Sequence, residues 1–215
     1  HVVEYGLTNR NLEGITEIGL DEIFVFKGYK CLTLVYQLNQ GCRRLLWCGP
    51  HRRVKTLLRF FREFGKERSH GLKFICSDMW APYLKVVAKK APNALNILDR
   101  FHIMRKFNEA IDEVRRDEVR MFKEQHQENV LLKGRWLLLK RPENLSEKQT
   151  ARLRDLMKLN LSSVKAHLMR EDFQRFWSYR YPSWAGRFLD NWVTRTMQSN
   201  LEPMKKVAKT ITNHK

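Results

Sequence analysis

Short apolar runs separated by turn-forming residues make up most of the first hundred positions. The run at residues 16–26 alternates apolar with polar side chains, and residues 29–38 are rich in residue types that favour strands. Turn signals stand between the runs at Lys27-Gly28, Asn39-Gln40-Gly41 and Gly49-Pro50. The pattern therefore predicts five strands, at residues 16–26, 29–38, 43–48, 72–80 and 94–98.

The apolar spacing becomes helical after the third predicted strand. One helix is predicted from apolar residues that recur every three or four positions: Val54, Leu57, Leu58, Phe61 and Phe64. We expect this helix to close over residues 65–71, and a second helix follows Pro82, which suits a first helical turn. The element order β-β-β-α-β-α-β predicts an α/β fold with a mixed five-stranded sheet. Right-handed crossovers would place strands one, four and five side by side and parallel.

From residue 100 onward the apolar spacing is helical throughout. Ser146 and Gln149 form the pattern of a capping box, and Pro203 suits the start of a last helix. We expect three regions: a core over residues 1–103, a helical connector and insertion region over 104–200, and the start of a C-terminal helical part over 201–215.

Basic residues outnumber acidic residues along the whole chain. There are 41 Lys and Arg against 23 Asp and Glu, which gives a formal net charge of +18. Residues 1–100 and 101–215 both carry an excess, so the charge belongs to folded surfaces and predicts a polyanionic partner. Ribosomal, membrane-surface and heparin-binding proteins share this balance, so the charge alone does not identify that partner.

The four cysteines show no paired metal-binding spacing. They are Cys31, Cys42, Cys48 and Cys76, and their scatter favours reduced, intracellular thiols over a disulfide framework. Cys48 and His51 would be half of a metal site, but no further ligands stand at suitable spacing. No run approaches the roughly 20 apolar residues of a membrane span, and no signal peptide is visible. We therefore expect no membrane partner.

Three of the predicted strands contain or end at an aspartate. Asp21 lies within the first strand, Asp78 belongs to the fourth, and Asp99 follows the fifth. Open α/β sheets carry their chemistry at the carboxyl ends of strands, so we expect these carboxylates along one edge. Carboxylates hold the divalent cations with which nucleases activate a phosphodiester.

Each of these acids also has a structural explanation. Asp21 could pair with a core arginine or lie at a sheet edge, because an unpaired buried carboxylate is costly. Asp78 could cap the helix that follows it. Asp99 could pair with Arg100, and His102 could be a hydrogen-bonded core imidazole rather than a group that orients water or contacts phosphate.

Basic and aromatic residues alternate at several places, among them Arg43, Arg44 and Trp47, and again Arg135 and Trp136. Arginine binds phosphate in a bidentate manner, and aromatic rings can stack on bases. The alternative is that the rings are core and the charges face water. We expect most of Trp177, Trp184 and Trp192 to be interior.

Several longer strings of residues resemble one known family. They are I-G-L-D-E at residues 18–22, S-D-M-W-A-P-Y at 77–83, D-R-F-H at 99–102 and L-E-P-M-K-K at 201–206. In this order, and over nearly the whole chain, they resemble bacterial DDE transposases of the ISL-three type. The resemblance implies an RNase H-like core that is interrupted by a helical insertion before the last catalytic helix.

The resemblance also implies roles for individual residues. It assigns the first two catalytic aspartates, which are also metal ligands, to Asp21 and Asp78, with Mg²⁺ or Mn²⁺ as the cofactor. Asp99, Arg100 and His102 would support these ligands or face DNA. Further DNA contacts are expected at Arg43, Arg44, Arg115, Arg116, Arg135, Lys205 and Lys206. The implied activity is cutting insertion-element ends and joining them to target DNA, by a homo-oligomer associated with the nucleoid in the bacterial cytoplasm.

The third catalytic carboxylate of such transposases is a glutamate beyond the L-E-P-M-K-K segment. Glu202 does not match it, and this chain stops before the motif. We therefore expect an internal transposase fragment with two of three carboxylates, inactive by itself. Two alternatives stay open: another RNase H-like nuclease with Asp99 as its third acid, and a decayed DNA-binding relative without catalysis.

Overall fold

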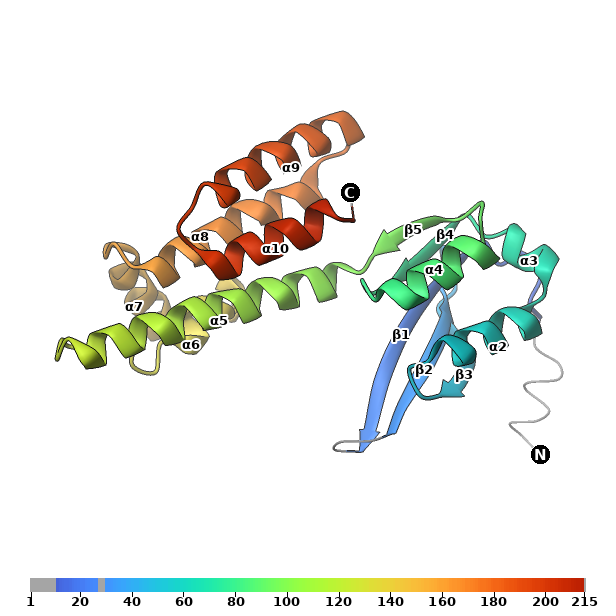
Figure 1. Cartoon of the computed structure of the whole chain (residues 1–215), viewed down its shortest axis with the longest axis horizontal. Coiled ribbons are helices and arrows are strands. Elements are labelled where there is room, and N and C mark those ends of the chain that lie inside the picture. Colours follow the sequence, from blue (N-terminus) through green and yellow to red (C-terminus); the bar gives the residue numbers. More distant parts are fainter. Residues whose placement is uncertain (1–10, 27–29, 215) are drawn as a thin grey trace. The chain divides into compact units, whose positions relative to one another are not determined.

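A computed structural model of the chain describes residues 11–26 and 30–214. The turn expected at Lys27-Gly28 lies outside these residues. The chain divides into two compact units, residues 1–102 and 103–215. The first unit contains the sheet, and the second is helical (Figure 1).

The first unit contains five strands in the order β3-β2-β1-β4-β5. Strand β1 pairs antiparallel with β2 and parallel with β4, while β3 is antiparallel to β2 and β5 is parallel to β4. This confirms the α/β class and the mixed sheet, and the arrangement is consistent with an RNase H-like fold. The strands are β1 (Glu17–Phe26), β2 (Lys30–Gln37), β3 (Arg44–Pro50), β4 (Phe74–Ser77) and β5 (Leu95–Leu98).

Helices α2 (Val54–Phe64) and α4 (Ala81–Lys90) contact each other and cover one face of the sheet (Figure 1). Because side chains alternate along a strand, Ile18 and Leu20 of β1 both point toward these helices and are buried in their core. The opposite face leaves apolar side chains of β4 and β5 exposed, including Leu95. The helices therefore determine which face of β1 is desolvated.

The region after α2 differs from the sequence prediction. Residues 65–71 do not simply close α2, because a separate short helix, α3 (Lys66–His70), follows it. Gly65 separates the two helices with φ of 93°, a conformation that residues with a Cβ rarely adopt. The backbone N–H of Gly65 still donates to the carbonyl of Phe61 at 3.1 Å, which ends α2.

The second unit consists of helices. Helix α5 begins in the first unit at Arg100 and continues to Glu124. It is followed by α6 (Arg135–Leu139), α7 (Glu147–Met157), α8 (Ser162–Gln174), α9 (Pro182–Met197) and α10 (Glu202–Thr212). Two short 3₁₀ helices are η1 (Pro142–Asn144) and η2 (Arg175–Ser178). The expected capping box is confirmed: Ser146 accepts from the N–H of Gln149, whose side chain accepts from the N–H of Ser146.

Three aromatic rings form the centre of the second unit. Phe107 of α5, Phe173 of α8 and Trp192 of α9 are each at most 1% exposed. The Phe107 ring lies 4.8 Å from Phe173 and 5.5 Å from Trp192 between centroids. Trp192 is thus interior, but Trp177 is only half-buried and Trp184, near the start of α9, is 62% exposed. The expectation that most of these three tryptophans are interior is therefore wrong.

A buried polar pair on α8 joins that helix to α6. The ring of His167 has Nδ1 2.9 Å from the carbonyl oxygen of Leu138, and Arg170 donates to the carbonyl of Leu139 at 3.2 Å. Burial lowers the pKa of His167, and the charge of Arg170 acts in the same direction, while Glu171 and the hydrogen bond to Leu138 oppose them. His167 is therefore neutral in the folded protein at neutral pH.

This neutral histidine predicts a loss of stability in acid. Its ordinary pKa is 6.5 and its folded pKa is lower, so between the two values the unfolded chain binds more protons. The free energy of unfolding should fall as pH drops through 6.5, by at most about 1.4 kcal/mol per pH unit from this residue. Urea denaturation of wild type and His167→Gln over this range measures the effect. Equal slopes in both proteins would show that another group is responsible.

Candidate active site

The sheet register brings the three predicted aspartates to the same level. Gly19 of β1 is paired with Cys76 of β4, which is paired with Ile97 of β5. Two residues further along each of these segments stand Asp21, Asp78 and Asp99. Strands β4 and β5 end immediately before their aspartates, whereas β1 continues past Asp21. Three carboxylates from neighbouring parallel strands thus occupy one edge.

Asp21 and Asp99 share a histidine. His102 Nε2 lies 3.8 Å from a carboxylate oxygen of Asp21 and 3.8 Å from one of Asp99. The Asp21 side chain is 51% exposed, so a cation in solution can reach it. Burial raises the pKa of the nearby Cys76 thiol to about 11, and the charges of Asp99 and Asp21 add to the rise. The thiol beside these acids is therefore protonated and unreactive at neutral pH.

Asp78 belongs to a different ion-pair group. Its Oδ2 accepts from the Arg52 guanidinium, and its Oδ1 accepts from the Trp80 N–H at 3.0 Å. Arg52 also stacks on the Trp80 ring at 4.6 Å, and its Nε lies 3.3 Å from Glu22 Oε1, at ion-pair distance but without hydrogen-bond geometry. One guanidinium therefore lies between the Asp78 and Glu22 carboxylates.

Glu22 is the buried acid of this edge. Its side chain is 8% exposed, against 51% for Asp21, because position 22 shares its strand face with Ile18 and Leu20. Burial raises the pKa of Glu22 to about 7; Arg52 opposes the shift, and Asp78 and Asp21 add to it. The sequence prediction missed Glu22 and Arg52, although the alternation along the strand could have assigned Glu22 to the buried face.

Arg52 should stabilise the folded state through Glu22. In Arg52→Gln, Glu22 keeps its burial but loses its nearest positive charge, which should cost about 1–3 kcal/mol at pH 8. Adding Glu22→Gln should recover part of this loss, because only the Asp78 carboxylate then lacks its cation. Urea denaturation of both single variants and the double variant in EDTA gives the coupling energy. Strictly additive effects would contradict the pairing.

The structural explanations considered for the three aspartates have different outcomes. The alternative for Asp99 was an ion pair with Arg100. The structure gives its carboxylate the role of a helix cap, since it accepts from the N–H of Phe101 at 2.8 Å at the start of α5. Asp78 does not cap α4, whose N-cap residue is Trp80 and has no side-chain cap. Asp21 lies within strand β1 as expected, but its side chain is half exposed rather than buried. Its Oδ1 accepts from the N–H of Glu22 at 2.8 Å and lies 3.8 Å from His102 Nε2, rather than beside a core arginine.

A model of a transposase family matches residues 18–215 of this chain, which is most of its length. The chain belongs to the ISL3 family of DDE transposases. Two curated proteins are similar to this chain in sequence: the transposase of insertion sequence element IS1001 from Bordetella parapertussis and that of IS1557 from Mycobacterium tuberculosis. The first is 29% identical over 189 residues, which cover 87% of this chain and 46% of the relative. The second is 26% identical over 223 residues, which cover 94% of this chain and 50% of the relative. The chain thus spans about half the length of these relatives.

The oxygen-rich edge of this ISL3-family chain fits a hard divalent cation. Mg²⁺ takes oxygen ligands and is commonly held by one or two carboxylates together with water and substrate phosphate. Asp21 is open to solvent, and Asp78 stands at the same level on the neighbouring strand with a cationic partner already on its carboxylate. Within residues 11–26 and 30–214, no three His, Cys, Asp or Glu residues form a metal cage.

The basic residues expected at DNA are divided between the two units. Arg115, Arg116 and Arg135 lie around Asp112 in the second unit, at 2.8, 3.8 and 3.5 Å. In the same unit, Lys205 is paired with Glu202 and Lys206 with Glu113. In the first unit Arg44 donates to Gln37 and Asn11, and Arg43 is exposed. Their contacts with DNA stay a prediction, as does that of Arg100.

All four cysteines are free thiols, and Cys48 is exposed. Among the described residues, no helix is long and apolar enough to cross a membrane.

Proposed function

We propose that this chain is the part of a DNA transposase that supplies two of its catalytic carboxylates, Asp21 and Asp78, and that it works on insertion-element ends and target DNA. The observation that carries the proposal is the register, which brings both acids to one level on adjacent parallel strands in a chain of this family. We also propose that the protein works as a homo-oligomer that associates with the nucleoid in the cytoplasm.

The residues of the site have different roles at the reacting phosphate. Asp21 and Asp78 would hold Mg²⁺ or Mn²⁺, which when bound activates the attacking oxygen and neutralises charge on the phosphate. The N–H of Trp80 orients the Asp78 carboxylate, and His102 orients Asp21. Arg52 forms an ion pair with Asp78 in the metal-free protein. It would release one carboxylate oxygen when a cation is bound.

The test is a cleavage assay with DNA ends taken from the inverted repeats that flank the coding sequence. The protein is this chain extended to the length of its relatives. We expect strand cleavage at the repeat ends in Mg²⁺ or Mn²⁺, none in EDTA, and joining of the cut ends to a second DNA. An absence of inverted repeats together with an absence of cleavage would favour the decayed DNA-binding relative.

A second candidate function is a related nuclease in which Asp99 acts as a third ligand. The observation that favours it is the position of His102, equally distant from Asp21 and Asp99. The helix-capping hydrogen bond of Asp99 weakens this candidate, because that carboxylate already has a structural role. Cleavage of DNA without joining would favour the nuclease.

A further inference from the structure

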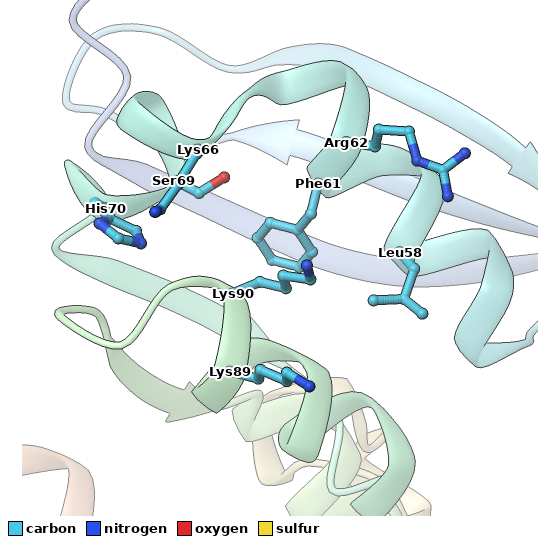
Figure 2. A pocket seen from close by; sticks show the side chains of 8 residues that line it. All are labelled: Leu58, Phe61, Arg62, Lys66, Ser69, His70, Lys89 and Lys90. Atoms are coloured by element: carbon cyan, nitrogen blue, oxygen red, sulfur yellow. The ribbon is translucent and has the colours of Figure 1, made fainter.

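Helices α2, α3 and α4 enclose a cavity of about 450 Å³ in the first unit. Five basic side chains line it: Arg62 of α2, Lys66 and His70 of α3, and Lys89 and Lys90 of α4. Its apolar surface comes from Leu58 and Phe61 (Figure 2). No acidic side chain of the described residues lines it. We refer to this feature as the basic cavity.

The cations of the basic cavity lack the ion pairs found elsewhere in the molecule. Among the described residues, no carboxylate lies within 4.0 Å of the charged groups of Arg62, Lys66, Lys89 or Lys90. By contrast, Arg59 on α2 is paired with Glu63 at 2.7 Å. All four side chains are exposed. Like charges that converge without a counterion favour an anion from solution.

Helix dipoles explain only part of this arrangement. Arg62, Lys89 and Lys90 lie in the last turns of α2 and α4, where a cation stabilises a helix by about 0.3–1 kcal/mol. That effect acts within each helix and does not require three helices to bring their charges to one cavity. Figure 2 shows Lys66 and His70 reaching the cavity from α3, and Lys89 and Lys90 from α4.

The donors of the basic cavity suit a polymer backbone better than a small ligand. Ser69 is the buried hydroxyl of the lining, and it already donates to the carbonyl of Gly65 at 2.6 Å. The remaining charged donors are mostly flexible lysine ammonium groups, which act as point charges without fixed geometry. Such groups bind nucleic-acid phosphates irrespective of sequence.

The basic cavity is separate from the sheet edge that carries Asp21, Asp78 and Asp99. Helix α4 begins three residues after Asp78 and ends at Lys90. Its ten residues correspond to a length of about 15 Å, at 1.5 Å per residue. A phosphate bound in the cavity is therefore not the phosphate that reacts at Asp21 and Asp78.

We propose that the basic cavity binds the phosphate backbone of duplex DNA as a second contact, remote from the cleaved phosphodiester. The choice of DNA as the polyanion rests on the proposed function. The contact itself does not involve the metal ligands, so it holds DNA on the first unit irrespective of the cation.

The experiment measures DNA binding by the 215-residue chain in EDTA, using fluorescence anisotropy of a labelled duplex of arbitrary sequence. Affinity is followed between about 50 and 200 mM KCl. Lys89→Ala/Lys90→Ala should reduce the slope of log K against log salt by about 2, and lower affinity at 100 mM by at least about tenfold. Arg62→Ala/Lys66→Ala should act in the same direction.

The matched control is Lys55→Ala/Lys85→Ala, which removes the same charge from exposed positions of α2 and α4 outside the cavity. It should keep the wild-type slope. An equal loss in the control and the cavity variants would overturn the proposal, since general surface charge would then explain binding. Tight binding of inorganic phosphate that Lys89→Ala/Lys90→Ala removes would also overturn it, by identifying a small-anion site. Because no metal is present, neither outcome bears on Asp21 and Asp78.

Discussion

Asp78→Asn will abolish DNA cleavage by the chain extended to its relatives' length, with a loss of about a thousandfold or more. A bound metal supplies several kcal/mol of transition-state stabilisation, and each 1.4 kcal/mol is a factor of ten in rate. Asparagine can still accept from the Trp80 N–H, so the local backbone is kept. Asp21→Asn should give a loss of similar size. Single-turnover cleavage of repeat-end DNA in Mg²⁺ measures both.

Asp99→Asn is the matched control for this prediction. It changes the same functional group at the same level of the sheet. Asparagine is as good a helix cap as aspartate, so the start of α5 is kept. We expect a much smaller loss of cleavage than in Asp78→Asn. Losses of the same size in the two variants would show that Asp99 is a ligand, and would favour the related nuclease.

Phe107→Ala will have the largest effect on folding. Its ring is fully buried between Phe173 and Trp192, and removal of such a ring leaves a cavity that costs about 3–5 kcal/mol. This is a large part of the 5–15 kcal/mol by which whole domains are typically stable. Guanidinium denaturation followed by circular dichroism measures the loss in the helical unit.

The control for Phe107→Ala is Phe101→Ala, a change on the same helix at a side chain that is 68% exposed. It should change the free energy of unfolding by less than about 0.5 kcal/mol. If Phe107→Ala were no more destabilising than Phe101→Ala, the aromatic cluster would not be the core of the second unit.

The strands were predictable because each has a local signal. The β1–β5 positions follow from apolar alternation and from turns such as Gly49-Pro50, and their predicted ends differ from the observed ends by a few residues. The separate helix α3 was not predictable from apolar periodicity. It depends on the conformation of Gly65 and is too short to show a repeat.

The site was predictable at the level of the sheet and not at the level of side chains. Right-handed crossovers are enough to bring Asp21, Asp78 and Asp99 to one edge. The partners of those acids depend on residues remote in sequence: Arg52 reaches Asp78 across 26 positions, and no spacing pattern reports that contact. The role of Asp99 as a helix cap required the start of α5 to be located.

Binding of Mn²⁺ to the 215-residue chain, followed by the electron paramagnetic resonance of the free ion, tests the central claim most directly. If Asp21 and Asp78 hold one cation together, each single change to asparagine should weaken Mn²⁺ binding by at least about tenfold. Substitution of a residue that only hydrogen-bonds to a metal ligand already lowers metal affinity by about that much. The double variant should show little further loss, and Asp99→Asn should bind as wild type does. Wild-type affinity in Asp21→Asn or Asp78→Asn, or loss of binding in Asp99→Asn alone, would contradict the account.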